Sequence, residues 1–204
     1  IIDLTLGSCF NQPIDNLPNG LTHLYLCGNF NQPIDNLPNS ITHLTLTLDC
    51  HFNQPIDNLI SSYSGNITHL SLSHNFNHPL NNLPPNLKTL RLNTNCSTVL
   101  TEIVNIANRG VDITVTVSCD GIGTVHDFVR WPIPWDEFYR NLMTYKTMPI
   151  KLNLWTTVSI LNVDDLPNIQ SFAKEHGIDH SYAYLKQPEV LDVNNKDREA
   201  VDAY

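Results

Sequence analysis

Residues 10–29 read FNQPIDNLPNGLTHLYLCGN, and closely related words follow them through the first half of the chain. The word FNQPIDNL recurs from Phe30 and from Phe52, and FNHPLNNL starts at Phe76. These starts lie 20, 22 and 24 residues apart, and a repeat of that length is typical of solenoid proteins. The chain opens on IIDLTL, which matches the end of an earlier copy. We therefore expect this chain to be a fragment of a longer product.

A second block follows each of these words and carries leucine or isoleucine at alternating positions. Its copies are LTHLYL from Leu21, ITHLTL from Ile41, ITHLSL from Ile67 and LKTLRL from Leu87. Side chains alternate between the two faces of a β-strand, so each block predicts a strand whose leucines point into a core. Proline fixes φ and has no N–H to donate, so the proline-containing words predict extended, non-helical return segments. Stacked copies predict a solenoid of parallel strands.

The wording FNQPI-x-x-LP resembles the FNIP repeat, a variant of the leucine-rich repeat whose strand block reads L-x-x-L-x-L-x-x-N/C. The resemblance covers residues 1–95 and implies a protein-interaction solenoid, sometimes attached to other domains. We therefore expect the outward strand side chains to line the concave face and to bind a protein partner. These side chains are Asp3, Thr5, His23, Tyr25, His43, Thr45, His69, Ser71, Thr89 and Arg91.

Three of these outward positions are histidines on successive strands. Adjacent strands lie about 4.8 Å apart, so His23, His43 and His69 are candidates for sharing a metal ion. No carboxylate or thiolate completes such a site, and a solvated polar ladder copied passively with the repeat is the competing interpretation. A weak pH response of the ladder is a third interpretation.

The pattern changes after Asn95. Hydrophobic spacing predicts helices over 98–109, 135–146 and 164–176, and strands over 111–118, 150–160 and 178–185. Gly110 and Gly177 are placed to end two of these helices, and Asp164 or Asp165 to cap one. The order β-α-β-α-β-α-β favours right-handed crossovers and a parallel sheet. The sequence thus predicts an α/β fold, in which a leucine-rich-repeat-like parallel β solenoid (1–95) continues into a partial (β/α) barrel (96–191) with a charged tail (192–204).

Residues 118–142, SCDGIGTVHDFVRWPIPWDEFYRNL, carry a second resemblance. The run S-x-D-G, then H-D-x-x-R and a helix, is similar to the fourth-strand segment of radical SAM enzymes of the twitch or SPASM branch. The likeness extends over about residues 90–191. It implies that Ser118 and Asp120 approach the ribose of S-adenosylmethionine (SAM), that Arg130 engages its carboxylate, and that Asn162 faces the same mouth. From the residues alone, Asp120 also fits a turn and Arg130 a surface ion pair.

The motif that powers radical SAM chemistry is missing from this sequence. A [4Fe–4S] cluster needs CxxxCxxC, and the five cysteines are widely spaced. We therefore expect no cofactor and no catalytic residue, and the chain is not expected to be an enzyme as it stands. The alternative is a fragment of a radical SAM enzyme that retains part of the SAM site. Residues 87–95 fit both patterns, so a natural fusion and a misassembled reading frame both stay open.

Composition and charge bound the partners and the compartment. The formal net charge is −9 and no basic block occurs, which argues against binding to a nucleic-acid backbone. No apolar run approaches the ~20 residues of a membrane span, so no membrane partner is expected. Five cysteines in a chain of 204 residues do not form the dense framework of a secreted domain. We expect reduced thiols and a cytoplasmic protein.

Overall fold

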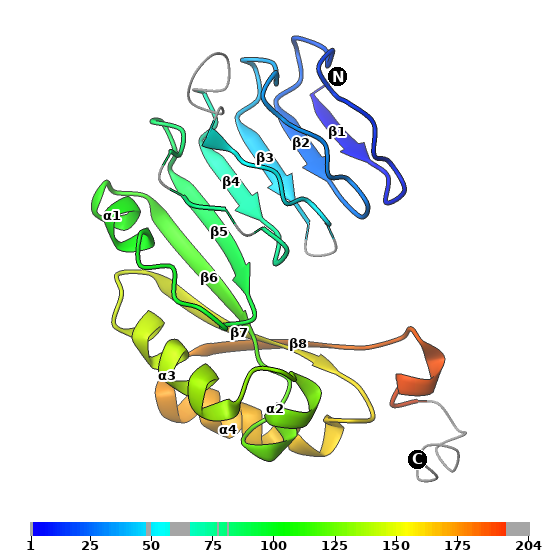
Figure 1. The fold of residues 1–204 in the computed structure, drawn as a ribbon, viewed down its shortest axis with the longest axis vertical. Coiled ribbons are helices and arrows are strands. Elements are labelled where there is room, and N and C mark those ends of the chain that lie inside the picture. Colours follow the sequence, from blue (N-terminus) through cyan, green and yellow to red (C-terminus); the bar gives the residue numbers. More distant parts are fainter. Residues whose placement is uncertain (1, 48–49, 58–65, 77, 81, 195–204) are drawn as a thin grey trace. The chain divides into compact units, whose positions relative to one another are not determined.

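A computed structural model describes residues 2–47, 50–57, 66–76, 78–80 and 82–194. These residues form one all-parallel sheet of eight strands whose order follows the sequence from β1 to β8 (Figure 1). The chain divides into two compact units. The first comprises Ile1–Thr94, Leu100–Val115 and Pro149–Lys151, and the second Asn95–Val99, Thr116–Met148 and Leu152–Tyr204. The predicted boundary near residue 95 stays a prediction.

Each leucine-rich block forms a strand, as predicted. The strands of the repeats are β1 (Asp3–Leu6), β2 (His23–Leu26), β3 (His43–Leu46), β4 (His69–Leu72) and β5 (Thr89–Thr94). They pair in parallel with equivalent residues opposite one another, so Leu24 faces Leu44 and Leu44 faces Leu70. Because side chains alternate across a strand, this register collects the leucines on one face. Leu24, Leu44 and Leu90 are fully buried there.

Phenylalanine rings run parallel to this leucine core in the return segments. Phe10, Phe30, Phe52 and Phe76 stack with centroids 6.2 to 6.3 Å apart and with ring planes within 10° of parallel. Phe30 and Phe52 are fully buried. The described return segments contain no α-helix, which confirms the prediction made from their prolines. Buried phenylalanine therefore holds each return segment against the sheet without regular secondary structure.

Polar residues of the FNQP motif form hydrogen bonds from each copy to the one before it. The backbone N–H of Asn31 donates to Asn11 Oδ1 (2.9 Å), and that of Asn53 donates to Asn31 Oδ1 (2.9 Å). Gln32 Nε2 also donates to Asn11 Oδ1 at 3.0 Å. Further along the word, Asn36 Nδ2 donates to Asp15 Oδ1 at 3.0 Å. These bonds supply partners for polar groups that have no strand ladder of their own.

The predicted helices and strands follow β5 in the expected order, and one further short helix, α2, lies between β6 and α3. They are α1 (Ile103–Asn108), β6 (Asp112–Ser118), α2 (Thr124–Val129), α3 (Trp135–Lys146), β7 (Lys151–Val158), η2 (Val163–Asp165), α4 (Leu166–His176), β8 (Asp179–Tyr184) and η3 (Glu189–Leu191). The predicted helix 98–109 is too long at its start. Ile103 N and Val104 N donate to carbonyls only three residues back, so a tight turn precedes α1.

The ends of α4 confirm one expectation and correct another. Gly177 adopts the left-handed conformation (φ 62°) and ends the helix, as predicted. Asp165 occupies the N-cap position but makes no capping bond. Its carboxylate instead accepts from Ile122 N and from Asn168 Nδ2. The side chain is therefore used to fix the loop after β6.

The partial barrel expected for residues 96–191 is not shown. Strands β6, β7 and β8 follow β5 in a sheet that is ordered from one end to the other. No helix among the described residues is long and apolar enough to cross a membrane.

We predict that replacing Gly28 with alanine destabilises the repeats. Gly28 has φ +57°, and a Cβ there would lie 2.1 Å from the carbonyl oxygen of Ser8 in the preceding copy. Both strain and collision oppose the substitution, so the free energy of unfolding should fall by at least about 2 kcal/mol. Urea unfolding followed by circular dichroism measures the loss.

Gly7→Ala is the matched control, because a Cβ at Gly7 meets nothing within 4 Å. It should leave the urea midpoint nearly unchanged. Equal effects of the two substitutions would contradict the role given to the close approach at Gly28.

Candidate functional site

The outward side chains of the repeat strands share one sheet face, as the sequence predicts. Register places His23 opposite His43 and His43 opposite His69, with Thr89 next. The second outward row runs through Tyr25, Thr45, Ser71 and Arg91 in the same way. We call this surface the histidine face. It is defined by Asp3, Thr5, His23, Tyr25, His43, Thr45, His69, Ser71, Thr89 and Arg91.

The three imidazoles of the histidine face stack on one another. The ring centroids of His23 and His43 lie 4.1 Å apart with planes 18° from parallel. Those of His43 and His69 lie 4.0 Å apart at 8°. The spacing is slightly below the usual distance between neighbouring strands. The sheet register therefore fixes the rings in a continuous stack.

A threonine holds each ring in place. The Nδ1 atoms of His23, His43 and His69 lie 2.8, 2.9 and 2.8 Å from the hydroxyl of the threonine that precedes each. Each threonine hydroxyl also donates to a backbone carbonyl of the copy before it. A hydroxyl has one proton to give, so its oxygen accepts from Nδ1–H. This assigns the neutral rings as Nδ1–H tautomers with a lone pair on Nε2.

The stack does not have the geometry of a metal site. Lone pairs of an imidazole lie in the plane of the ring, so stacked parallel rings direct them side by side rather than toward one point. Among the described residues, no group of three or more His, Cys, Asp or Glu side chains is arranged to hold a metal ion. The metal hypothesis for His23, His43 and His69 gains no support from this arrangement.

Neighbouring rings also set the protonation of the middle histidine. Burial lowers the pKa of His43, and the adjacent His69 and His23 lower it further. Asp3 acts in the opposite direction, and its carboxylate lies 3.1 Å from His23 Nδ1. A charge on one ring therefore opposes a charge on the next.

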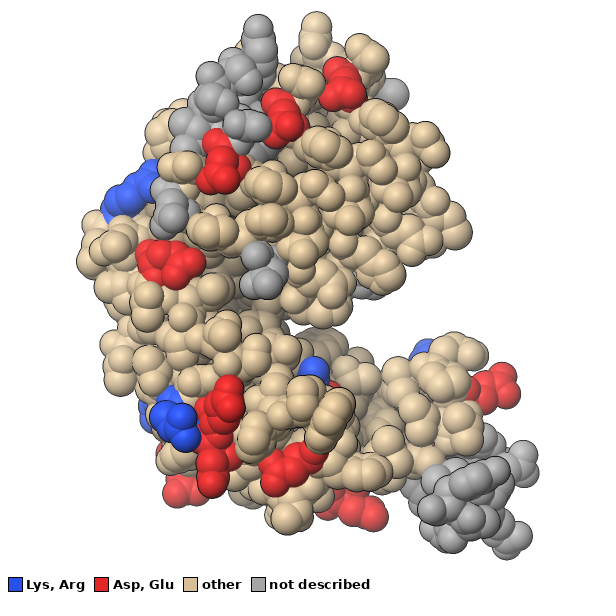
Figure 2. All heavy atoms as spheres, viewed as in Figure 1, with Lys and Arg blue, Asp and Glu red and all other residues tan. Residues whose placement is uncertain are grey.

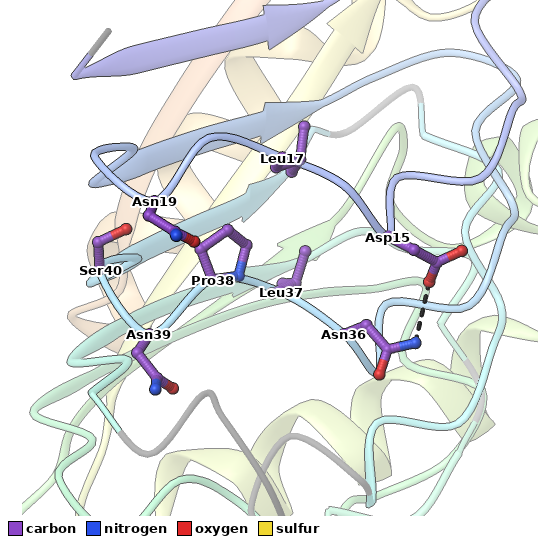
Figure 3. A pocket seen from close by; sticks show the side chains of 8 residues that line it. All are labelled: Asp15, Leu17, Asn19, Asn36, Leu37, Pro38, Asn39 and Ser40. Atoms are coloured by element: carbon purple, nitrogen blue, oxygen red, sulfur yellow. Dashed lines mark hydrogen bonds between the residues drawn. The ribbon is translucent and has the colours of Figure 1, made fainter.

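A pocket of about 440 Å³ lies on the return segments of the first two copies (Figure 3). Leu17, Leu37 and Pro38 supply its apolar part. Asp15 is the one titratable side chain in its lining, and Figure 3 shows this carboxylate joined to the amide of Asn36. The pocket therefore lacks the paired acid and base of a hydrolytic site.

The second unit brings together three of the four residues that the radical SAM resemblance singled out. Arg130 Nη2 lies 2.8 Å from Asp120 Oδ2. Asn162 Nδ2 donates to the carbonyls of Asp120 (2.9 Å) and Thr157 (3.0 Å). Ser118 is the last residue of β6 and makes no side-chain hydrogen bond or ion pair to the other three. We call Asp120, Arg130 and Asn162 the strand-end cluster.

Bonds within the protein occupy most of this cluster. Asp120 Oδ1 accepts a hydrogen bond from Thr157 N (2.7 Å), while Asp120 Oδ2 forms an ion pair with Arg130. Asn162 Oδ1 accepts from Ser159 N (2.7 Å), and both of its amide hydrogens are donated to carbonyls. Burial raises the pKa of Asp120, and Arg130 opposes that rise. The cluster ties the loop after β6 to the end of β7.

Sequence reasoning missed the burial of His126. The residue is fully buried in α2, with ring centroids 5.4 Å from Trp135 and 4.4 Å from Phe138. Neither ring nitrogen makes a hydrogen bond. Burial, and then the nearby Arg130, lower the pKa of His126 to about 4. The sequence signal for this burial is the pair of aromatic residues in 135–138, since they predict an apolar helix face.

The buried cysteines are poor nucleophiles. Burial raises the pKa of Cys96 and of Cys119 to about 12. Both thiols are fully buried. Cys119 raises the pKa of Cys96 further, whereas the Gly121 backbone and Arg130 partly oppose the rise at Cys119. Thiol chemistry at neutral pH needs the thiolate, so neither side chain is suited to nucleophilic catalysis.

Neutral burial of His126 predicts a loss of stability in acid. The unfolded chain binds a proton below pH 6.5, whereas the folded chain binds it only near pH 4. The stabilisation is therefore complete above pH 6.5 and falls with pH, by about 2 kcal/mol at pH 5. Urea unfolding measures the free energy of unfolding at pH 7 and at pH 5. The difference between the two values should be smaller in His126→Phe than in the wild type by that amount.

His74→Gln serves as the control, because His74 is exposed. It should keep the wild-type difference between pH 7 and pH 5. If the wild type and His126→Phe lost the same stability between pH 7 and pH 5, the assignment of a neutral buried ring would be contradicted.

Comparison with known proteins agrees with the repeat. Residues 10–49 match the family model described as FNIP Repeat. No curated protein matches the chain. A solved structure described as "The crystal structure of CroV588 a novel circular LRR protein structure" is 39% identical with a TM-score of 0.38, and the match covers 45% of this chain and 14% of that one. The chain thus spans a small part of that protein's length, and a likeness with this TM-score adds nothing to the fold described above.

None of these findings supports the radical SAM resemblance, and the family match confirms FNIP repeats within residues 10–49.

Proposed function

We propose that the chain is a protein-binding module that uses the histidine face of its FNIP-type leucine-rich repeats. One observation carries this proposal: the outward side chains of five strands form a single in-register array that the core does not use. The buried leucines and phenylalanines supply stability on the other side of the strands. One face of the strands therefore builds the core, and the other is left for binding.

The chemistry of the face suits a peptide or protein surface. Tyr25 offers an aromatic ring with a hydroxyl, and Thr45 and Ser71 offer short polar side chains beside it. Tyrosine is enriched at protein interfaces because it combines a large contact area with a hydrogen-bonding group. The strand register also fixes these groups before binding, which lowers the entropic cost of association.

The same proposal includes the compartment and the absence of a resident cofactor. None of the five cysteines, all of which the structure describes, forms a disulfide; this fits a reducing compartment, and we place the module in the cytoplasm. The proposed activity is binding alone and needs neither a metal nor an organic cofactor.

A substitution in the middle of the face tests the proposal. Peptides selected from a displayed random library at pH 7.5 should bind wild-type protein and lose at least about tenfold in affinity for Thr45→Arg. An arginine there projects from the centre of the face and obstructs a bound chain. Fluorescence anisotropy with the selected peptides measures the affinity.

Asn16→Arg is the matched control, since Asn16 is exposed on a return segment. It should bind the selected peptides as the wild type does. Failure to enrich any peptide, or equal binding by both variants, would count against the histidine face as the binding surface.

A second candidate function is SAM binding at the strand-end cluster, the remnant of a radical SAM-like half-barrel. Its support is that Asp120, Arg130 and Asn162 lie together after strands β6 and β7. Parallel sheets commonly bind ligands at the carboxyl ends of their strands. The internal bonds of these residues weigh against it, because SAM must displace them.

Calorimetric titration of the chain with SAM tests this candidate. We expect no heat of binding and no rise in unfolding temperature, because Asp120 and Asn162 have their hydrogen-bonding groups occupied. A stoichiometric heat that disappears in Arg130→Met would instead establish the residual SAM site.

A further inference from the structure

The histidine face differs in charge from the rest of the chain. The chain has a formal net charge of −9, and Figure 2 shows many acidic and few basic side chains on the side that it displays. The face carries one carboxylate, Asp3, against Arg91 and three histidines. The remaining side chains of the face are hydroxyl groups. Its charge therefore depends on how many imidazoles are protonated.

The stack limits where protons add. Rings 4.0 and 4.1 Å apart repel one another when both are charged. His23 and His69 are two stacking intervals apart, so both can be charged while His43 between them stays neutral. The lowered pKa of His43 agrees with this order. Charge on the stack is therefore least opposed on rings that are not direct neighbours.

Protonation also reverses the hydrogen-bonding character of the exposed ring edge. Nδ1 of each ring is already bonded to a threonine. In the neutral ring, Nε2 is an acceptor and offers nothing to a carboxylate, which is also an acceptor. In the charged ring, Nε2–H is a donor and makes a charge-assisted bond to a carboxylate.

The charged and titratable groups around the stack are few. Asp3 on β1 faces His23, Tyr25 lies on β2, and Arg91 lies on β5 beyond His69. Lys88 is exposed just before β5. Arg91 and Lys88 add to the attraction for an anionic partner at the other end. Asp112, whose N–H donates to the Lys88 carbonyl, lies beside that end and pairs with Lys151.

We propose that the histidine face binds a carboxylate-rich segment of a partner protein, and that proton uptake by the stacked imidazoles makes this binding stronger below neutral pH. The inference rests on the proposed function and adds the charge of the partner and the linkage to protons. Charge complementarity carries it: protonation gives this face of an acidic chain positive charge on three stacked rings, and the Nε2 edges of those rings become donors.

A nucleic acid is the less suitable anion. Phosphate-backbone binding depends on several lysines or arginines that displace counterions. The face has one arginine, and the rest of the chain is acidic. Discrete carboxylates placed opposite two separated imidazoles match the face better than a continuous row of phosphates.

The experiment uses a fluorescent peptide of alternating aspartate and glycine, with anisotropy read at pH 7.5 and 5.5 at constant ionic strength. Aspartate stays ionised at both values, and pH 5.5 lies above the range in which His126 titrates. Affinity should rise at least about fivefold at pH 5.5, the gain from one proton whose pKa rises by about one unit on binding.

Three comparisons make the result specific. The triple variant His23→Gln, His43→Gln, His69→Gln keeps polar side chains of similar size and should lose the pH response, since no imidazole is left on the face. His74→Gln, an exposed histidine outside the histidine face, should keep it. A serine–glycine peptide and an oligodeoxythymidine of the same length should bind less tightly than the acidic peptide, and circular dichroism at pH 5.5 checks the fold.

Several outcomes would overturn the inference. They are an affinity independent of pH, a pH response that survives in the triple variant, or preferred binding of the oligodeoxythymidine. If library peptides need Thr45 while the acidic peptide shows no pH response, the proposed function stands and this inference fails. If neither the library peptides nor the acidic peptide binds at either pH, both fail.

Discussion

Hydrogen bonds from each copy to the next are the interaction on which the rest of the repeat depends. Asn31 shows how they work, since its backbone N–H donates to Asn11 while its own side-chain oxygen accepts from Asn53. A segment without helix or strand has backbone groups that lack regular partners, and the asparagine amide supplies them. The phenylalanine stack behind these asparagines likewise adds one ring with each copy. The strands then keep one register, and that register brings the imidazoles to within about 4 Å.

The sequence predicts the strands well because their signal is local. Alternating leucines mark one face of a strand wherever the strand lies, and β1 to β5 follow that pattern. The helix over 135–146 was predicted with its observed bounds, because proline precedes it and an apolar stripe runs along it. The asparagine and glutamine of FNQP were not explained in advance, because their partners lie one copy away. The short helix α2 was missed, since six residues contain too little of a 3.6-residue period.

In the candidate sites too, the sequence pattern reveals some features, whereas others depend on atomic positions. The row of His23, His43 and His69 is visible in the sequence, whereas the stacking and the threonine contacts depend on atomic positions. Asp120, Arg130 and Asn162 were grouped by the resemblance to a SAM site, and the structure places them together. Their bonds join one another and the backbone, and residue types alone do not distinguish a ligand contact from such an internal network. His126 escaped notice because its burial comes from Trp135 and Phe138, which fold back onto it.

The asparagine contacts also bear on how such a chain changes over evolutionary time. Asn31 is a donor toward Asn11 in the copy before it and an acceptor toward Asn53 in the copy after it. A whole copy is therefore chemically interchangeable with its neighbour, and its removal or duplication leaves matching groups at the new junction. Unequal recombination between near-identical gene segments produces such changes. The number of copies, and with it the length of the histidine row, is then a trait that selection can adjust without altering any single contact.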